Sequence, residues 1–183
     1  MKPKDPVFLS GKKVVLEPLS MRHFSNRYLQ WMNDPVVCAD NRHAVLPCTG
    51  TQMKNYLRHA PKSKADILFA IRLKKSGRHV GNISLNGISW INRSGEISVL
   101  IGEKSVWGRG IGTDACRLVM DYGFERLGLH RIWMGMTSRN IGMVKIARRL
   151  SMKREGVFKD FLFKDGRYLD MEQWRKINAG REG

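Results

Sequence analysis

The stretch VWGRGIGTDA, residues 106–115, places glycines at three alternate positions, 108, 110 and 112. A strand-like apolar run, Ile97 to Ile101, precedes it, and a helix-like pattern follows it. Successive glycines between a strand and a helix let main-chain N–H groups converge at the helix N-terminus, where the helix dipole also favours an anion. The spacing therefore predicts either a cradle for an anion such as a phosphate group or a plain strand-to-helix turn.

Two common phosphate loops do not fit this stretch. A P-loop has the pattern GxxxxGK[ST], and no Lys-Ser or Lys-Thr pair follows these glycines. A dinucleotide fold requires GxGxxG directly after the strand and an acidic residue about 20 positions later. Here the spacing is GxGxG, and His130-Arg131 stands at the later position. The anion cradle at a helix N-terminus and the plain turn are the interpretations that remain.

The rest of the chain predicts a single domain over residues 1–183 with mixed strands and helices. Three apolar runs separated by short turns predict an antiparallel meander: Ile67–Leu73, Val80–Ile91 and Glu96–Ile101. Other strands are predicted at Lys13–Leu19, His130–Met136, Val157–Phe163 and Arg167–Trp174, the last two joined by an Asp-Gly turn. Helices are predicted at Met21–Asn33 after a Ser20 cap, Gln52–His59, Thr113–Leu127 before Gly128, and Ile141–Leu150. This order predicts an α/β fold with a partly antiparallel sheet.

The chain has a net charge of +17, which favours polyanionic partners such as nucleic acid, phosphorylated cofactors or nucleotide-linked substrates. The basic residues are spread along the whole sequence, so a generally positive surface is expected rather than a nucleic-acid-binding arm. The three cysteines and five histidines show no metal-ligand spacing, and no metal is expected. The sequence has neither a secretory signal pattern nor an apolar run of about 20 residues, so we expect a cytoplasmic protein.

The segment from Gly95 to about Gly156 resembles the acetyl-CoA-binding core of the GNAT superfamily of N-acetyltransferases. Its motifs are GEISVLIGEKSVWGRGIG, then a helix, then HRIWMGMTSRN and a second helix. Gly110 and Gly112 match the glycines of the family signature Arg/Gln-x-x-Gly-x-Gly/Ala, whereas Trp107 replaces its Arg or Gln. WMNDPVV, YGFERLGLHRI and DGRYLD are similar to ribosomal-protein N-terminal acetyltransferases and to acetyltransferases of nucleotide-linked amino sugars.

This resemblance implies a GNAT-like mixed sheet with helices on both faces and a V-shaped splay between Glu96–Ile101 and His130–Met136. It implies that acetyl-CoA lies in the splay and that a main-chain N–H near Leu100 or Ile101 polarises the thioester carbonyl. Arg109, Lys145 and Arg148 are candidate contacts to the phosphates. The remaining implied cofactor-binding residues are Trp107, Gly108, Gly110, Ile111, Gly112, Thr113 and Asn140, the last of which also suits a helix cap.

The implied reaction is direct attack of a substrate amine on acetyl-CoA, with Glu96 as the candidate base. An ion-paired or solvent-facing strand carboxylate is the alternative interpretation of Glu96. Many family members protonate the departing thiolate with a helix tyrosine, but Ala147 occupies that position here. Water, Tyr168 or Tyr122 could replace it, although Tyr122 suits core packing better.

The acceptor is expected to be a primary amine, either a protein N-terminus or a nucleotide-linked amino sugar. Asp40, Arg42 and His43 lie in an irregular segment predicted to border its pocket. Docking on the ribosome would suit a basic surface, and monomers or homodimers are usual in the family. The competing hypothesis is a GNAT-like basic module that binds RNA or protein without catalysis, which the charge of +17 and Ala147 support.

Overall fold

The computed structural model describes residues 6–41 and 43–180, and within these ranges eight strands form one sheet. The strand order is β1-β2-β3-β4-β5-β6-β8-β7, and all neighbouring pairs are antiparallel except the parallel pair β5–β6. The strands are β1 (Leu9–Ser10), β2 (Val14–Pro18), β3 (Ile67–Leu73), β4 (His79–Ser89), β5 (Ser94–Ile101), β6 (Arg131–Thr137), β7 (Lys153–Lys164) and β8 (Arg167–Ile177). The helices are α1 (Asn26–Asn33), α2 (Gly50–His59), α3 (Ile111–Asp121) and α4 (Ile141–Arg149).

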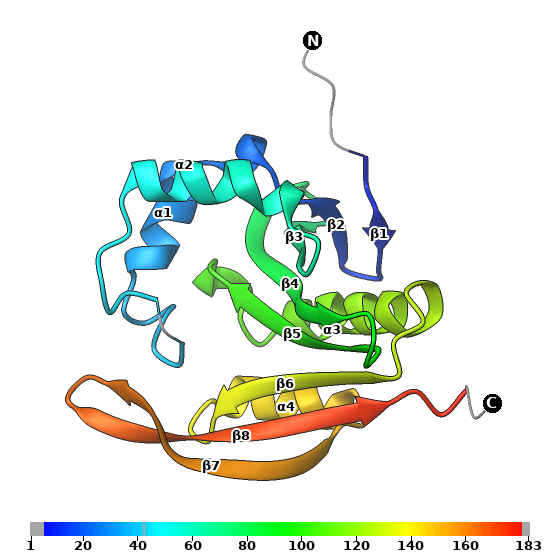
Figure 1. Cartoon of the computed structure of the whole chain (residues 1–183). Helices are drawn as coiled ribbons and strands as arrows, with labels where there is room; N and C mark the ends of the chain where they lie inside the picture. Colours follow the sequence, from blue (N-terminus) through cyan, green and yellow to red (C-terminus); the bar gives the residue numbers. More distant parts are fainter. Residues whose placement is uncertain (1–5, 42, 181–183) are drawn as a thin grey trace.

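Helices cover both faces of the sheet, which confirms the expected GNAT-like fold class (Figure 1). Successive side chains of a strand point to opposite faces. On β3, Phe69 and Ile71 join the apolar cluster that includes residues of α3 and α4. Ala70 joins a separate cluster with residues of α1 and α2, such as Trp31 and Leu57. The sheet is therefore the middle layer, and each face has its own apolar contacts.

The predicted helix Met21–Asn33 is wrong as a single element. Residues Met21–His23 form one 3₁₀ turn, Phe24 is extended, and α1 begins only at Asn26. Ser25 caps α1, because its side chain accepts a hydrogen bond from the Tyr28 N–H at 3.1 Å. Ser20 caps only the short turn. The helix ends at Asn33, as predicted from the Asp34-Pro35 pair that follows.

The other predicted elements are present, with shifted ends. Strand β1 was not predicted, since two residues carry no periodic signal. Helix α3 starts earlier than expected, at Ile111, and continues as a π-helical turn over Tyr122–Arg126 before Gly128 at φ +67°. The Asp165-Gly166 hairpin is confirmed, with both residues at positive φ. Strand β7 starts at Lys153 rather than Val157 and contains two irregularities in its pairing with β8.

Candidate active site

The parallel strands β5 and β6 separate along their length. They pair only from Ser94↔Arg131 to Glu96↔Trp133, although β5 continues to Ile101 and β6 to Thr137. Figure 1 shows the two strands diverging toward their carboxyl ends. The predicted V-shaped splay is thus present, with its apex at Glu96.

The direction of the main chain along β5 decides which groups face the splay. The Arg93 carbonyl accepts hydrogen bonds from the N–H groups of His130 and Arg131, at 2.7 and 3.1 Å, on the β6 side. Main-chain groups of successive strand residues point to opposite edges. Residues 95, 97, 99 and 101 therefore face β6, and the even-numbered residues face β4. Of the two expected donors, Ile101 directs its N–H into the splay, while Leu100 lies opposite Asn82 of β4.

The three glycines of the loop after β5 have different conformations. Gly108 and Gly110 have φ of +72° and +77°, in the left-handed region that suits glycine. Gly110 is the N-cap residue of α3 and has no side chain to cap the N–H groups of the first turn. Gly112 lies within that turn, where an added Cβ would be 3.0 Å from Ile146 Cδ1 of α4. The first two glycines thus shape the loop, and the third allows α4 to pack closely.

Lys13, which is close to the N-terminal end of the chain, lies against this loop. Lys13 Nζ donates to the Arg109 carbonyl at 2.6 Å, and a Cβ on Gly110 would be 3.2 Å from the same Nζ. Asp114 of α3 accepts the N–H groups of Lys13 and Val14 at 2.7 and 3.1 Å. These contacts fix the start of β2 to the loop and place a positive charge beside it. Lys13 was missed as a site residue because nothing in the sequence indicates a contact across 96 residues.

Trp107 spans the loop. The residue is 43% exposed, and its indole N–H donates to the Ile101 carbonyl at 2.8 Å. The Ile111 side chain is buried in the core, so only its main chain is available to a ligand. Arg109 is exposed and Thr113 is half-buried. The predicted residues of this loop therefore lie together at the start of α3.

Helix α4 begins beside the end of β6. The Asn140 side chain accepts a hydrogen bond from the Met143 N–H at 3.0 Å, which confirms the predicted cap. Ala147, at the position where the resemblance implies a tyrosine, is fully buried in the core. Tyr122 packs against Phe8 and Phe69, with ring centroids 5.3 and 6.2 Å away, in agreement with the expected packing role.

Glu96 lies on the α1–α2 side of the sheet, because its neighbour Ile97 is buried on the opposite side. A Cβ on Gly135 would lie 3.5 Å from Glu96 Oε1. The carboxylate is therefore over β6, at the apex of the splay. Such a position suits a base that acts on an amine entering from the α1–α2 side.

Asp40 lies in the segment between α1 and α2, and its carboxylate has two partners at the end of β6. Asp40 Oδ1 accepts hydrogen bonds from Thr137 Oγ1 and Arg139 Nε, both at 2.8 Å. Arg139 also donates to the Ala39 carbonyl at 2.6 Å. His43 is exposed, and its pKa is lowered by two causes. The larger is partial desolvation of the ring, and the smaller is the positive charge of Lys164. Arg42, the third predicted acceptor contact, lies outside the described residues.

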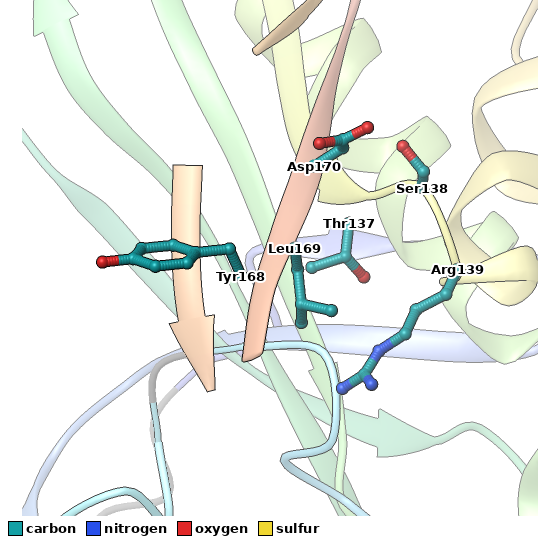
Figure 2. Close-up of a pocket in the computed structure, with 6 residues that line it drawn as sticks. All are labelled: Thr137, Ser138, Arg139, Tyr168, Leu169 and Asp170. Carbon is teal, nitrogen blue, oxygen red and sulfur yellow. The ribbon is translucent and has the colours of Figure 1, made fainter. Parts of the chain in front are cut away.

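A pocket of about 280 Å³ opens next to this segment (Figure 2). It is lined by the end of β6 and the residues after it, and by the start of β8: Thr137, Ser138, Arg139, Tyr168, Leu169 and Asp170. A hydrogen bond from Lys159 is the main cause that lowers the pKa of Asp170, and the carboxylate also accepts the Asp160 N–H at 3.1 Å. Tyr168 is 63% exposed at the pocket edge. Of the residues that line this pocket, the sequence had indicated only Tyr168 as a candidate functional residue.

The described residues give little support for a metal-dependent or thiol-dependent reaction. Over residues 6–41 and 43–180, His, Cys, Asp and Glu form no group of three that could hold a metal ion. Burial raises the pKa of the Cys116 thiol to about 12, which agrees with an unreactive core thiol. Among the helices that the structure describes, none is both long and apolar enough to span a membrane.

Comparison with known proteins agrees with this geometry. The family model of the acetyltransferase (GNAT) domain matches residues 13–153. The chain is 31% identical over 103 residues to the uncharacterized N-acetyltransferase p20 of Bacillus licheniformis. That match covers 56% of this chain and 57% of the relative, so the chain spans little more than half of the relative's length.

Solved structures share the fold at lower identity. RimL, a ribosomal L7/L12 alpha-N-protein acetyltransferase in complex with coenzyme A, superposes with a TM-score of 0.83 at 18% identity, over 94% of this chain and 96% of RimL. Spermidine N-acetyltransferase from Vibrio cholerae, with coenzyme A and spermine, superposes with a TM-score of 0.78 at 20% identity, over 90% and 95% of the two chains. At these identities the likeness shows the fold alone.

Proposed function

The chain belongs to the acetyltransferase (GNAT) domain family, and from this premise we propose that it transfers the acetyl group of acetyl-CoA to a primary amine. The observation that carries the proposal is the splay of β5 and β6 beside an uncapped helix start. A strand edge without a partner strand offers main-chain donors and acceptors to an extended ligand. A glycine-shaped helix N-terminus offers N–H groups to an anion.

The residues present fit coenzyme A. The N–H groups at the start of α3 would bind its pyrophosphate, with Gly108 and Gly110 allowing the close approach of the main chain. Lys13 and Arg109 would add positive charge at the same loop. Asn140 and the start of α4 would border the pantetheine arm, which would lie along the edge of β5 between Glu96 and Ile101.

In the proposed reaction, the amine nitrogen forms a bond to the acetyl carbon and the carbon–sulfur bond breaks. Glu96 accepts the amine proton, directly or through water, since an α-amine with a pKa of about 8 is largely protonated at neutral pH. The Ile101 N–H donates to the thioester oxygen as negative charge develops there. Solvent water protonates the departing thiolate, because Ala147, at the position where the family resemblance implies a tyrosine, has no proton to donate.

The proposed acceptor is an amine carried by an anionic molecule, such as a nucleotide-linked amino sugar or an N-terminus presented by the ribosome. RimL acts on a ribosomal protein, while the Vibrio enzyme binds spermine. A net charge of +17 attracts anionic carriers and repels a polycation such as spermidine. The charge therefore favours an acceptor of the first kind.

Calorimetry with acetyl-CoA tests the donor, and coenzyme A release tests the reaction. The acceptor probes are a UDP-linked amino sugar, an acidic peptide with a free N-terminus, and spermidine as the cationic comparison. We expect binding of acetyl-CoA and release of coenzyme A with one of the two anionic probes. No binding at millimolar acetyl-CoA would contradict the enzyme proposal and leave a GNAT-like module that binds RNA or protein.

A further inference from the structure

A buried lysine at the end of the β7–β8 hairpin has no place in the reaction proposed above. Lys164 is only 4% exposed. Its Nζ donates to the carbonyls of Cys38 at 2.5 Å, Asn41 at 2.9 Å and His43 at 3.0 Å. An ammonium group has three donors, and all three are used here on one segment 121–126 residues away in the chain. We refer to residues 38–43, without Arg42, as the acceptor-side loop.

The shape of β7 brings Lys164 to this loop. Pairing with β8 passes from Phe158↔Met171 to Leu162↔Leu169, so three residues of β7 lie opposite one residue of β8. Asp160 has φ +49°, and its N–H donates to Asp170 at 3.1 Å. Such a bulge bends and twists a strand. In Figure 1 the end of the hairpin accordingly turns toward the segment that follows α1.

The same loop is fixed at a second point by β6. Asp40 is held there by Thr137 and Arg139, as described above. One contact therefore comes from the hairpin and the other from the end of β6, which also forms one side of the splay. The Cys38 carbonyl also accepts the Asn41 N–H at 3.2 Å, and Lys164 Nζ is the donor that joins all three carbonyls. Carbonyl oxygens that converge on one point repel one another unless a positive charge lies between them. The loop's closed shape thus depends on the Lys164 ammonium.

We propose that Lys164 is a positioning residue for the acceptor, which acts by holding the acceptor-side loop across the α1–α2 side of the splay. This inference rests on the proposed function. The residue touches neither substrate but sets the loop to which the acceptor would bind, so its removal changes acceptor binding and leaves donor binding intact. The glycine loop after β5, where coenzyme A would bind, is held by separate contacts of Lys13, Trp107 and Asp114.

The test compares Lys164→Met with Lys153→Met, which removes an exposed lysine from the same strand. Hydrogen exchange should rise at least tenfold for the N–H groups of Cys38 and Asn41, which donate to the carbonyls of Asp34 and Cys38 in the wild type. The acceptor KM, measured with the anionic amine that the wild type acetylates, should rise at least tenfold. Coenzyme A affinity should stay within twofold and kcat within threefold, and Lys153→Met should match the wild type in all four.

Several outcomes would overturn the proposal. Unchanged exchange in a folded Lys164→Met protein would show that the ammonium does not hold the loop. Raised exchange with an unchanged acceptor KM would remove the role in acceptor binding, and an equal loss of coenzyme A affinity would make Lys164 a general structural residue. Lys164→Gln, which keeps two donors, should give intermediate exchange and KM.

Loss of cooperative unfolding in both Lys164 variants would also overturn the proposal, since Lys164 would then stabilise the whole fold. Failure of the proposed function has a different signature. If the wild type acetylates neither anionic probe, the acceptor role falls together with that function. The exchange measurement needs no substrate and still reports on the contact between Lys164 and the loop.

Discussion

The two sides of the splay are built in different ways. On the donor side, the groups aimed at a ligand are main-chain groups of β5 and of the α3 start, which belong to one continuous segment shaped by glycines. Lys13 and Asp114 fix this segment to the start of β2. On the acceptor side, the acceptor-side loop is positioned by the side chains of Arg139 and Lys164, which stand 99–126 residues further along the chain. Main-chain recognition tolerates many side chains, whereas a loop held by two charged side chains changes with each of them. The donor side can therefore stay constant while the acceptor side diverges.

The largest expected effect is on the donor side, in Gly110→Asp. The new carboxylate would lie at the start of α3, where we propose that the pyrophosphate of coenzyme A binds, and two like charges at about 4 Å repel by about 4 kcal/mol at an effective dielectric constant near 20. We expect coenzyme A affinity, measured by calorimetry, to fall by between about 10² and 10³. The acceptor-side loop should keep its wild-type hydrogen exchange.

Gly110→Asn is the matched control for this variant. Asn tolerates positive φ about as well as Asp, and it carries no charge. Its loss of affinity should therefore be near tenfold or less. Equal losses for Asp and Asn would indicate backbone strain at φ +77° as the cause and would remove the argument for an anion at this loop.

Glu96→Gln tests the apex, where the two sides meet. General-base catalysis typically contributes about 10²-fold or more, so we expect kcat to fall about 10²-fold at pH 7 with coenzyme A affinity unchanged. The loss should shrink as pH rises above the amine pKa of about 8, because the amine then loses its proton to solvent. Glu125→Gln, which changes an exposed carboxylate after α3, is the control. Full activity with an unchanged pH profile in Glu96→Gln would exclude Glu96 as the base.

Arg139→Gln removes the ion pair with Asp40, which is the second contact that holds the acceptor-side loop. The ion pair with Asp40 is about one-third exposed, so its loss should cost about 1 kcal/mol, and Thr137 still donates to Asp40. We expect the acceptor KM to rise about fivefold with coenzyme A affinity within twofold. Arg149→Gln, at an exposed arginine at the end of α4, should change neither value. A fall in coenzyme A affinity alone would reverse our assignment of the two sides.

The same contrast explains what could be predicted from the sequence. The strand–glycine–helix pattern predicted that a helix follows the glycine loop, within two residues of where α3 starts, because glycine spacing and apolar periodicity are local properties that determine main-chain geometry. Asn140 was predicted as a cap for the same reason. The splay was implied by the resemblance to the GNAT superfamily and not by this pattern. Lys13 and Lys164 were missed, since a lysine in a sequence gives no sign of which distant carbonyl its ammonium will meet.

Two errors had local causes. Phe24 continues the helical spacing of Tyr28 and Trp31, so the pattern favoured one helix from Met21, but Ser25 offers a second cap and α1 starts there. Strand β7 was shortened because charged residues at its start conceal the alternation, and its bulge at Asp160 depends on Asp170 of the facing strand. Capping competition and strand pairing are decided by energies that a periodic pattern does not contain.

Trp107→Phe should give the smallest effect, and it tests how far the donor side depends on a side chain. The variant keeps a ring but loses the indole N–H that donates to the Ile101 carbonyl at 2.8 Å. A net loss of about 1 kcal/mol in the free energy of unfolding corresponds to a fall of about 2–4 °C in Tm for a chain of this size. Because that bond holds the loop to the end of β5, coenzyme A affinity should also fall two- to threefold. Trp90→Phe, which loses a longer 3.3 Å bond to the Lys64 carbonyl far from the loop, should lower Tm less and leave affinity unchanged. If Trp107→Phe instead weakens affinity by tenfold or more at an unchanged Tm, Trp107 contacts coenzyme A directly, and the donor side depends on side chains as the acceptor side does.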